Sequence, residues 1–229
     1  ERIATLKVEM ARLKGLKRQM EASPHGQVSL TDPDSRSMAS QGKGTGIVGY
    51  NVQTAVETKH HLIVTHEVTN VGSDRAQLVK MAEAAREALG TEKLTAIADR
   101  GYYSSEQIKG CEDAGIAPVV PKPITSNSAA DGRYEKWDFT YLPKRDAYRC
   151  PAGEYAIRRF TSQEHGLTYY KYWSSAWPRC ALRSKCTTGD YRRLTRWEHE
   201  TVLERMQARL ERDPTLMITR RRTVEHTFG

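Results

Sequence analysis

Two short runs of alternating apolar residues constrain the fold of this chain more than any other feature. The first run covers residues 48–56, the second covers residues 62–68, and a polar segment of residues 57–61 separates them. Because successive side chains of a strand point to opposite faces, this period of two predicts two strands with one apolar face each. The short polar segment predicts a turn that joins the two strands into an antiparallel hairpin.

A helix and then a strand–helix–strand unit are predicted after the hairpin. Residues 73–89 carry apolar side chains at helical spacing, and residues 94–98 form a short apolar run typical of a buried strand. A helix over residues 104–114 begins with the spacing of a capping box, and residues 116–120 form the next strand. Such a unit places its two strands in parallel, with a right-handed connection.

The remaining segments flank this core. The N-terminal residues have the 3–4 spacing of an amphipathic helix that is already under way at the first residue, so we expect a fragment of a longer protein. A later segment is rich in Tyr, Trp, Arg and Cys and predicts a β-rich insertion. The predicted divisions are a helical-hairpin remnant (1–22), a linker (23–46), the core (47–121), the insertion (122–196) and the C-terminal helices of the core (197–229).

The charge of the chain is concentrated in its C-terminal part. Residues 1–132 carry 16 basic and 16 acidic side chains, whereas residues 133–229 carry 20 and 12, which accounts for the whole net charge of +8. This asymmetry favours a polyanionic partner such as DNA, and the alternative is a solvated basic surface. No apolar run approaches the ~20 residues that span a bilayer, and no signal peptide is visible, so we expect a cytoplasmic protein without a membrane partner.

Two acidic residues, Asp99 and Glu225, lie at positions typical of a catalytic or metal-binding site. Asp99 directly follows the strand of residues 94–98, and sites in open α/β sheets gather at the carboxyl ends of strands. A carboxylate there suits a hard divalent cation, and the alternative is an aspartate that turns the chain. Arg221 and Glu225 are four residues apart and share a helix face, with an exposed ion pair of little energetic value as the alternative.

Four segments, together with the order of the predicted elements, resemble a known family. They are TDPDSR (31–36), VGYNVQTAV (48–56), ADRGY (98–102) and RTVEHTFG (222–229). The chain resembles the DDE transposases over nearly its whole length, and more narrowly the bacterial IS1182-type transposases of the IS4/IS5 group. The resemblance implies an α/β fold with a ribonuclease-H-like mixed sheet flanked by helices and a β-rich insertion that holds cysteines and aromatic residues.

The resemblance also implies an activity and the residues that carry it. DDE transposases are polynucleotidyl transferases that cut DNA at the ends of an insertion sequence and join the 3′-hydroxyl to target DNA, usually as homodimers. Asp99 matches the second catalytic aspartate of the family and Glu225 the catalytic glutamate, both as ligands of Mg²⁺ or Mn²⁺. Arg221 matches the arginine four residues before the glutamate, and Ile218 stands where the family usually has tyrosine. Three carboxylates holding two metal ions about 3.5–4 Å apart would activate the attacking oxygen and stabilise the leaving one.

The first aspartate of the family usually lies on a strand ahead of a helical hairpin. We expect it upstream of Glu1, and Asp32 and Asp34 are the nearby candidates within the chain, although they lie in the predicted linker. With two of three carboxylates, this chain by itself is expected to be inactive. Two alternatives stay open: a non-catalytic DNA-binding remnant of a decayed transposase, and a metal-dependent nuclease of the same fold.

The insertion contains a cysteine pattern and an aromatic pattern. Cys150, Cys180 and Cys186 match a zinc-ribbon-like cluster of related transposases, but Trp177 stands where a fourth cysteine would fall, with His165 as a substitute ligand. The alternatives are a zinc site and a metal-free insertion. The aromatic residues alternate with basic ones, which is compatible either with base stacking and phosphate contact or with a core flanked by DNA-facing cations. These aromatic residues are Tyr169, Tyr170, Tyr172, Trp173 and Trp177, and the basic ones are Lys171, Arg179, Arg183 and Lys185.

Overall fold

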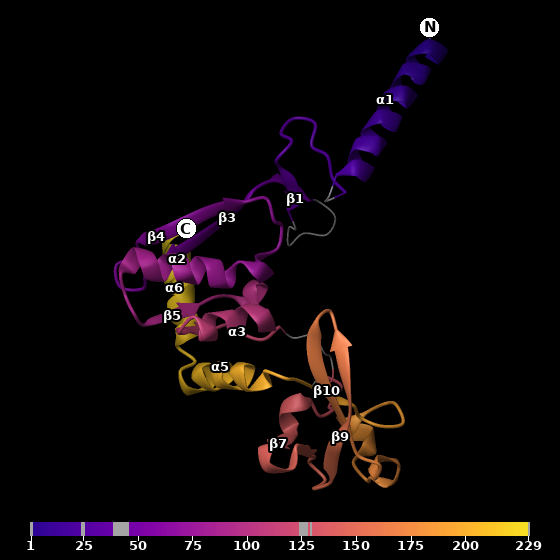
Figure 1. Cartoon of the computed structure of the whole chain (residues 1–229), viewed down its shortest axis with the longest axis vertical. Helices are drawn as coiled ribbons and strands as arrows, with labels where there is room; N and C mark the ends of the chain where they lie inside the picture. The colour runs from indigo at the N-terminus through magenta and orange to yellow at the C-terminus, as the bar shows by residue number, and fades with distance from the viewer. Residues whose placement is uncertain (1, 24–25, 39–45, 124–127, 129, 229) are drawn as a thin grey trace. The chain divides into compact units, whose positions relative to one another are not determined.

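The structure divides the chain into two compact units. It is a computed structural model that describes residues 2–23, 26–38, 46–123, 128 and 130–228. The first unit comprises Glu1–Pro121 and Met206–Gly229, and the second comprises Lys122–Arg205 (Figure 1). The predicted insertion over residues 122–196 therefore falls within the second unit, which extends to Arg205.

The first unit is a mixture of helices and short strands. Its helix α1 buries none of its residues, so the described part of the chain provides no partner for the apolar side of this predicted helix. Helix α5 (Glu200–Arg212) begins in the second unit and ends in the first. The elements of the first unit are α1 (Arg2–Ala22), β1 (Arg36–Met38), β2 (Ile47–Gly49), β3 (Asn51–Val56), β4 (Ile63–Thr69), α2 (Leu78–Leu89), β5 (Leu94–Ile97), α3 (Ser105–Asp113), β6 (Ile116–Val119) and α6 (Leu216–Phe228).

The predicted hairpin is present, but it is shorter than its sequence pattern. Strands β3 and β4 pair in antiparallel fashion with Asn51 opposite Thr69 and Thr54 opposite His66. The predicted strand over residues 48–56 is divided, because β2 separates from β3 and pairs with β1. Strand β1 lies within the predicted linker over residues 23–46, since backbone groups can form a ladder whatever the polarity of the side chains.

The strand–helix–strand prediction is confirmed. Strands β5 and β6 are parallel, with Leu94 opposite Ile116 and Ile97 opposite Val119. The predicted capping box of the intervening helix α3 is wrong, because the Ser104 side chain makes no capping hydrogen bond. Helix α2 ends at Gly90 with φ of +60°, a left-handed conformation that glycine adopts without steric cost.

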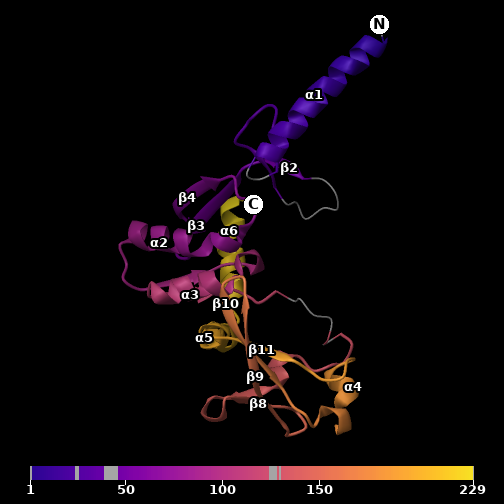
Figure 2. The same cartoon turned by 45° about the vertical axis from the view of Figure 1, so that its right-hand side comes forward.

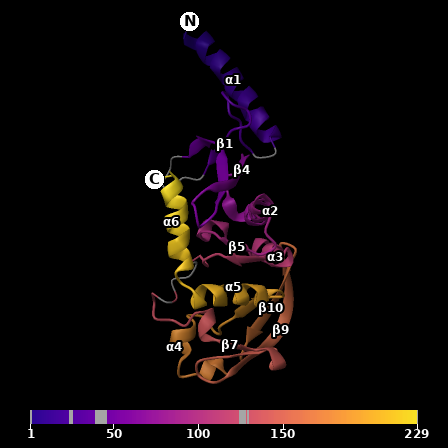
Figure 3. The same cartoon turned by 90° about the vertical axis from the view of Figure 1, so that its left-hand side faces the viewer.

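In the first unit, helices α2 and α3 pack on each other and on the strand pairs β3–β4 and β5–β6 (Figure 3), and the core lies among these elements. Helix α2 contributes a buried face, and α3 and β6 contribute fully buried apolar side chains. Among the described residues the pairs β3–β4 and β5–β6 are separate two-stranded sheets, whereas we expected one mixed sheet. The α/β class is confirmed, and a continuous ribonuclease-H-like sheet stays a prediction. The buried residues of α2, α3 and β6 are Leu78, Met81, Ala82, Ala85, Ile108, Cys111, Ile116 and Val119.

The second unit is built on a five-stranded antiparallel sheet, as expected for a β-rich segment (Figure 2). Its strand order is β11-β10-β9-β8-β7, so neighbours in sequence are neighbours in the sheet. Aromatic and cysteine side chains form one core cluster, which includes Tyr148, Tyr172 and Trp177. The elements are β7 (Thr140–Leu142), β8 (Ala147–Arg149), β9 (Tyr155–Glu164), β10 (Leu167–Trp173), α4 (Arg183–Cys186) and β11 (Leu194–Trp197).

Candidate functional site

Asp99 lies at the carboxyl end of β5, as its place in the sequence predicts. Its backbone is extended, and it caps the short 3₁₀ turn Arg100–Tyr102. The Asp99 Oδ1 atom accepts a hydrogen bond from the backbone N–H of Gly101 at 2.8 Å. The side chain is 44% exposed, so the carboxylate is held at the sheet edge and still meets solvent.

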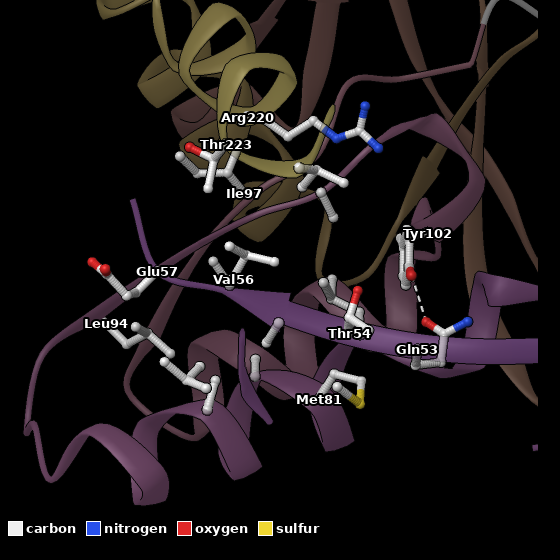
Figure 4. A pocket seen from close by; sticks show the side chains of 18 of the residues that line it. Gln53, Thr54, Val56, Glu57, Met81, Leu94, Ile97, Tyr102, Arg220 and Thr223 are labelled. Carbon is white, nitrogen blue, oxygen red and sulfur yellow. Dashed lines mark hydrogen bonds between the residues drawn. The ribbon is translucent and has the colours of Figure 1, made fainter. Parts of the chain in front are cut away.

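Helix α6 supplies the cation that faces Asp99. Arg220 donates from Nη2 to Asp99 Oδ2 at 2.9 Å, and the Arg220 side chain is 25% exposed. Arg220 and Thr223 come from the same face of α6, which lies over β5 in the close view of the cavity (Figure 4). The ion pair therefore fixes α6 against the carboxyl end of β5.

A second acidic residue, Asp74, organises the neighbouring start of β3. Its Oδ1 atom accepts hydrogen bonds from Asn51 Nδ2 and Gln53 Nε2, both at 2.7 Å. The hydroxyl of Tyr102 in turn donates to Gln53 Oε1 (Figure 4). This chain of hydrogen bonds connects β3 to the turn that holds Asp99.

The carboxylates of Asp74 and Asp99 both approach Gly101. A Cβ atom added to this glycine would lie 3.0 Å from Asp99 Oδ1 and 3.5 Å from Asp74 Oδ2. The two negative charges also act on Tyr102: burial first, and then Asp74 and Asp99, raise the pKa of its hydroxyl to about 12. Tyr102 is therefore a neutral hydrogen-bond donor throughout the physiological range, beside two acidic side chains.

Glu225 and Arg221 lie on the exposed side of α6. Their side chains are 66% and 74% exposed, and Arg221 Nε lies 4.0 Å from Glu225 Oε1. Neither residue lines the cavity that Asp99, Arg220 and Thr223 line. The two predicted partners thus share a helix face, but the structure does not join them to Asp99, and their catalytic roles stay predictions.

Asp32 and Asp34 lie in the loop ahead of β1. Asp32 accepts hydrogen bonds from the hydroxyl of Tyr50 at 2.9 Å and from the backbone N–H of Asp34 at 3.1 Å. The hydrogen bond from Tyr50 is the largest cause of the lowered pKa of Asp32. These contacts form a local turn, and neither aspartate lines the cavity beside Asp99.

The arrangement fits a metal-binding centre only in part. Asp99 and Asp74 offer the carboxylate oxygens that Mg²⁺ prefers, but Arg220 already pairs with Asp99. In the part of the chain that the structure describes, no group of three or more His, Cys, Asp or Glu side chains is arranged to hold a metal ion. The residues present therefore do not complete a two-metal site by themselves.

Three of the four cysteines meet in the core of the second unit. Cys150 and Cys186 are buried in its cluster and Cys180 packs against it, together with the buried Trp177. Burial raises the pKa of the Cys186 thiol, and the neighbouring Cys180 and Cys150 raise it further. In the described part of this unit, no group of three or more potential ligands is arranged to hold a metal ion, and zinc binding stays a prediction. The predicted substitute ligand His165 lies at a left-handed turn between β9 and β10, outside the cluster.

The aromatic residues of the insertion are buried to different extents. Tyr172 and Trp177 are fully buried. Trp173 is partly buried and packs against the core cluster, with the guanidinium carbons of Arg159 and Arg193 at 5.8 and 5.9 Å from its ring centroid. Tyr191 stacks near Trp173 with ring centroids 5.7 Å apart, and we call Arg159, Trp173, Tyr191 and Arg193 the Arg–Trp cluster.

Sequence reasoning missed three residues of the site beside Asp99. Arg220, Thr223 and Val224 of α6 all line the cavity, and their spacing of three and four residues places them on one helix face. This spacing is the sequence signal from which an inward-facing Arg220 could have been predicted. Asp74 and Gln53 had weaker signals. Gln53 is 2% exposed although the period of two over residues 48–56 places it on the polar face of the strand, and Asp74 follows the capping residue Ser73.

Comparison with known families identifies the class of protein. The sequence profile described as transposase DDE domain matches residues 21–229, so the chain belongs to this family. No curated protein and no solved structure matches the chain. Among the described residues, none of the helices is both long and apolar enough to cross a membrane.

Proposed function

We propose that the chain is the catalytic part of a transposase that cleaves DNA at insertion-sequence ends and transfers the cut strand to target DNA, with divalent metal ions as cofactors. The observation that carries the proposal is the match to the family over residues 21–229, together with Asp99 at the carboxyl end of β5. Asp99 and Glu225 are proposed as two of the three metal-binding carboxylates. The finer assignment to IS1182-type elements of the IS4/IS5 group rests on the segments at residues 48–56 and 98–102 together with the segment at residues 222–229.

The residues around Asp99 would hold its carboxylate in position and would take no direct part in the chemical step. Arg220 holds one oxygen of the carboxylate and the backbone of Gly101 holds the other, so the orientation of Asp99 is fixed before substrate arrives. When Mg²⁺ or Mn²⁺ is bound, it would supply the electrostatic stabilisation of the oxygens at phosphorus. Since Arg220 competes for Asp99, metal binding would require this arginine to release one oxygen and turn towards a DNA phosphate.

The second unit would provide part of the DNA contact. Arg159 and Arg193 pair with aromatic rings, and the ion pairs formed among the described residues include neither of them. Exposed guanidinium groups without carboxylate partners are available for phosphate oxygens. This surface agrees with the basic charge of residues 133–229.

The test measures DNA chemistry by the full-length protein. A DNA fragment that carries the terminal inverted repeats is incubated with Mg²⁺ or Mn²⁺ and a target plasmid, and nicked and joined products are quantified separately. We expect both products, and we expect Asp99→Asn and Glu225→Gln to lower each of them at least ~10³-fold. Asp113→Asn is the matched control, because Asp113 is 60% exposed on α3 and forms an ion pair with Lys109.

Each other result counts against the proposal. Unchanged cleavage in Asp99→Asn or Glu225→Gln contradicts the assignment of the carboxylates. Binding of the repeats without cleavage supports a non-catalytic remnant of a decayed transposase. Cleavage without joined products supports a metal-dependent nuclease of the same fold.

A further inference from the structure

An exposed phenylalanine lies beside two other aromatic rings in the second unit. Phe160 of β9 is 46% exposed, and its ring contacts that of Trp173 on β10, with centroids 5.8 Å apart and ring planes at 66°. The Trp173 ring in turn contacts that of Tyr191, with centroids 5.7 Å apart. Aromatic side chains contribute strongly to binding when a ligand covers them, so the open ring of Phe160 is a contact position at the end of an aromatic group.

A β-bulge in β9 lies directly before Phe160. Tyr172 of β10 is paired with Arg158 of β9 in the antiparallel sheet. The neighbouring Lys171 is paired with Phe160, so Arg159 is the extra residue of the bulge. A bulge bends its strand and changes the direction of the side chains around it, and bulges are frequent beside functional sites. Here the bulge places an exposed arginine and an exposed aromatic ring next to each other in the sequence.

The two arginines of the Arg–Trp cluster flank its tryptophan loosely. The guanidinium carbons of Arg159 and Arg193 lie 5.8 and 5.9 Å from the Trp173 centroid, near the limit of about 6 Å for a cation–π contact. Arg158, by contrast, lies 3.7 Å from the Tyr170 centroid and also forms an ion pair with a neighbouring carboxylate. The ion pairs among the described residues include neither Arg159 nor Arg193. Both arginines are therefore available to an anionic ligand.

The second unit as a whole is basic. Residues 122–205 carry 16 Lys and Arg side chains and 10 Asp and Glu side chains. Two carboxylates close to the cluster in sequence already have cationic partners: Glu164 pairs with Lys171 at 2.7 Å, and Asp190 pairs with Arg183 at 3.7 Å. A surface of this charge attracts a polyanion.

We infer that Phe160 and the Arg–Trp cluster form a binding site for single-stranded DNA, in which unpaired bases stack on the aromatic rings and the two arginines contact phosphates. We call this site the stacking face. Aromatic rings beside cations suit a single strand because every base has a π-face and every nucleotide carries a phosphate. In a duplex the bases stack on one another, so Phe160 would meet no free base. The inference rests on the proposed function in taking DNA as the ligand, and it adds the form of DNA that the second unit recognises.

The neighbours of Phe160 favour DNA over a protein partner. Arg159 and Thr161, on either side of Phe160, are both exposed and polar. A stable protein interface of standard size buries about 800 Å² on each partner around a core with few charged residues. A single open ring among cations does not provide such a core, but it provides a stacking position for one base.

Fluorescence anisotropy tests the stacking face. The probe is a labelled oligo-dT of 12 nucleotides, compared with a strand of 12 abasic sites, which has the same phosphates and no bases, and with a duplex of 12 base pairs. Binding to the chain is measured in EDTA at one fixed salt concentration, because phosphate contacts depend on salt. Stacking on an aromatic side chain changes affinity by about 5-fold to 150-fold per base, so oligo-dT should bind at least ~5-fold more tightly than the abasic strand.

Substitutions of Phe160 separate ring stacking from apolar contact. Phe160→Leu keeps an apolar side chain without the ring, so it should weaken oligo-dT binding at least ~5-fold and leave binding of the abasic strand and the duplex unchanged. Phe160→Trp keeps a ring and should bind oligo-dT as the unmodified chain does. Trp137→Ala is the matched control, because Trp137 is 71% exposed in the same unit and lies outside the stacking face. Circular dichroism should be the same for all variants, since Phe160 is only half-buried.

Every other result counts against the stacking face. Equal affinities for oligo-dT and the abasic strand, or equal losses in Phe160→Leu and Trp137→Ala, would overturn it. Loss of self-association in Phe160→Leu, measured by sedimentation, together with unchanged oligo-dT binding would instead identify a contact between copies of the chain. The assay contains no metal and measures no cleavage, so a failure of the proposed DNA chemistry is distinguishable from a failure of this site.

Discussion

Arg220 donates a hydrogen bond to Asp99 across 121 residues of sequence, and this contact fixes helix α6 against the carboxyl end of β5. The neighbouring Arg221 on the same helix makes a loose, exposed pair with Glu225 instead. Two adjacent arginines therefore have different surroundings. Because of this difference, Arg220→Ala and Arg221→Ala form a matched pair that tests how much the contact with Asp99 stabilises the fold.

Arg220→Ala should lower the free energy of unfolding of the first unit by about 1 kcal/mol. The loss is modest because Asp99 is 44% exposed and water replaces part of the interaction. Arg221→Ala, which removes an exposed side chain, should change it by less than about 0.5 kcal/mol. Urea unfolding followed by circular dichroism measures both, and equal effects would show that the Arg220–Asp99 pair does not fix α6.

Asp74→Ala should lower the free energy of unfolding by more than the removal of an exposed carboxylate does. Asp74 accepts from the side-chain amides of Asn51 and Gln53, and Gln53 is 2% exposed. The Gln53 amide also donates to Asn51 Oδ1 at 2.8 Å, so removing Asp74 leaves one of its two N–H groups without an acceptor, which costs about 1–3 kcal/mol. Asp113→Ala is the control, with an expected change within about 0.5 kcal/mol. The midpoints of urea unfolding of the two variants measure this difference, and similar midpoints would contradict the role of Asp74 as a buried acceptor.

Ionisation of the Tyr102 hydroxyl should lower the free energy of unfolding as the pH rises from about 10 to about 12. Its folded pKa is raised from 10.0 to about 12, so in this range the unfolded chain loses the proton that the folded chain retains. Bound protons then stabilise the folded state at low pH, and this contribution disappears as the pH rises through the folded pKa. Tyr102→Phe removes the titrating group, so the urea midpoint should fall less between pH 9 and pH 12 than it does with tyrosine. Identical pH profiles would contradict the assignment, whatever other tyrosines and lysines contribute to both.

Substitution in the Arg–Trp cluster should weaken DNA binding in a salt-dependent way. Arg159 and Arg193 are exposed and flank Trp173. If both contact phosphates, Arg159→Ala with Arg193→Ala should reduce the slope of log affinity against log salt by about 2. The control removes two other exposed cations of the second unit, with Lys144→Ala and Arg149→Ala. Fluorescence anisotropy with a duplex at several salt concentrations gives the slopes, and an equal loss in both double variants would indicate general charge rather than a specific surface.

The elements of the core could be predicted because their signals are local. The period of two in β3 and β4, and the apolar run of β5 before α3, depend on neighbouring residues alone. The position of Asp99 followed from the same pattern. The split between β2 and β3 could not be predicted, because the pairing of β2 with β1 depends on backbone contacts between distant segments.

The hairpin, the parallel strand–helix–strand unit, the acidic residue at its edge and the family could all be predicted from the order of residues. That Arg220 rather than Arg221 faces Asp99, and that Asp74 and Gln53 join the same site, depends on contacts between segments far apart in the chain. The reason is geometric: one residue along a helix turns the side chain by about 100°, so the packing of α6 on β5 selects which arginine points inward. The separation of the pairs β3–β4 and β5–β6 in the described part of the chain likewise belongs to the arrangement of elements, because no local pattern records which strand edges pair.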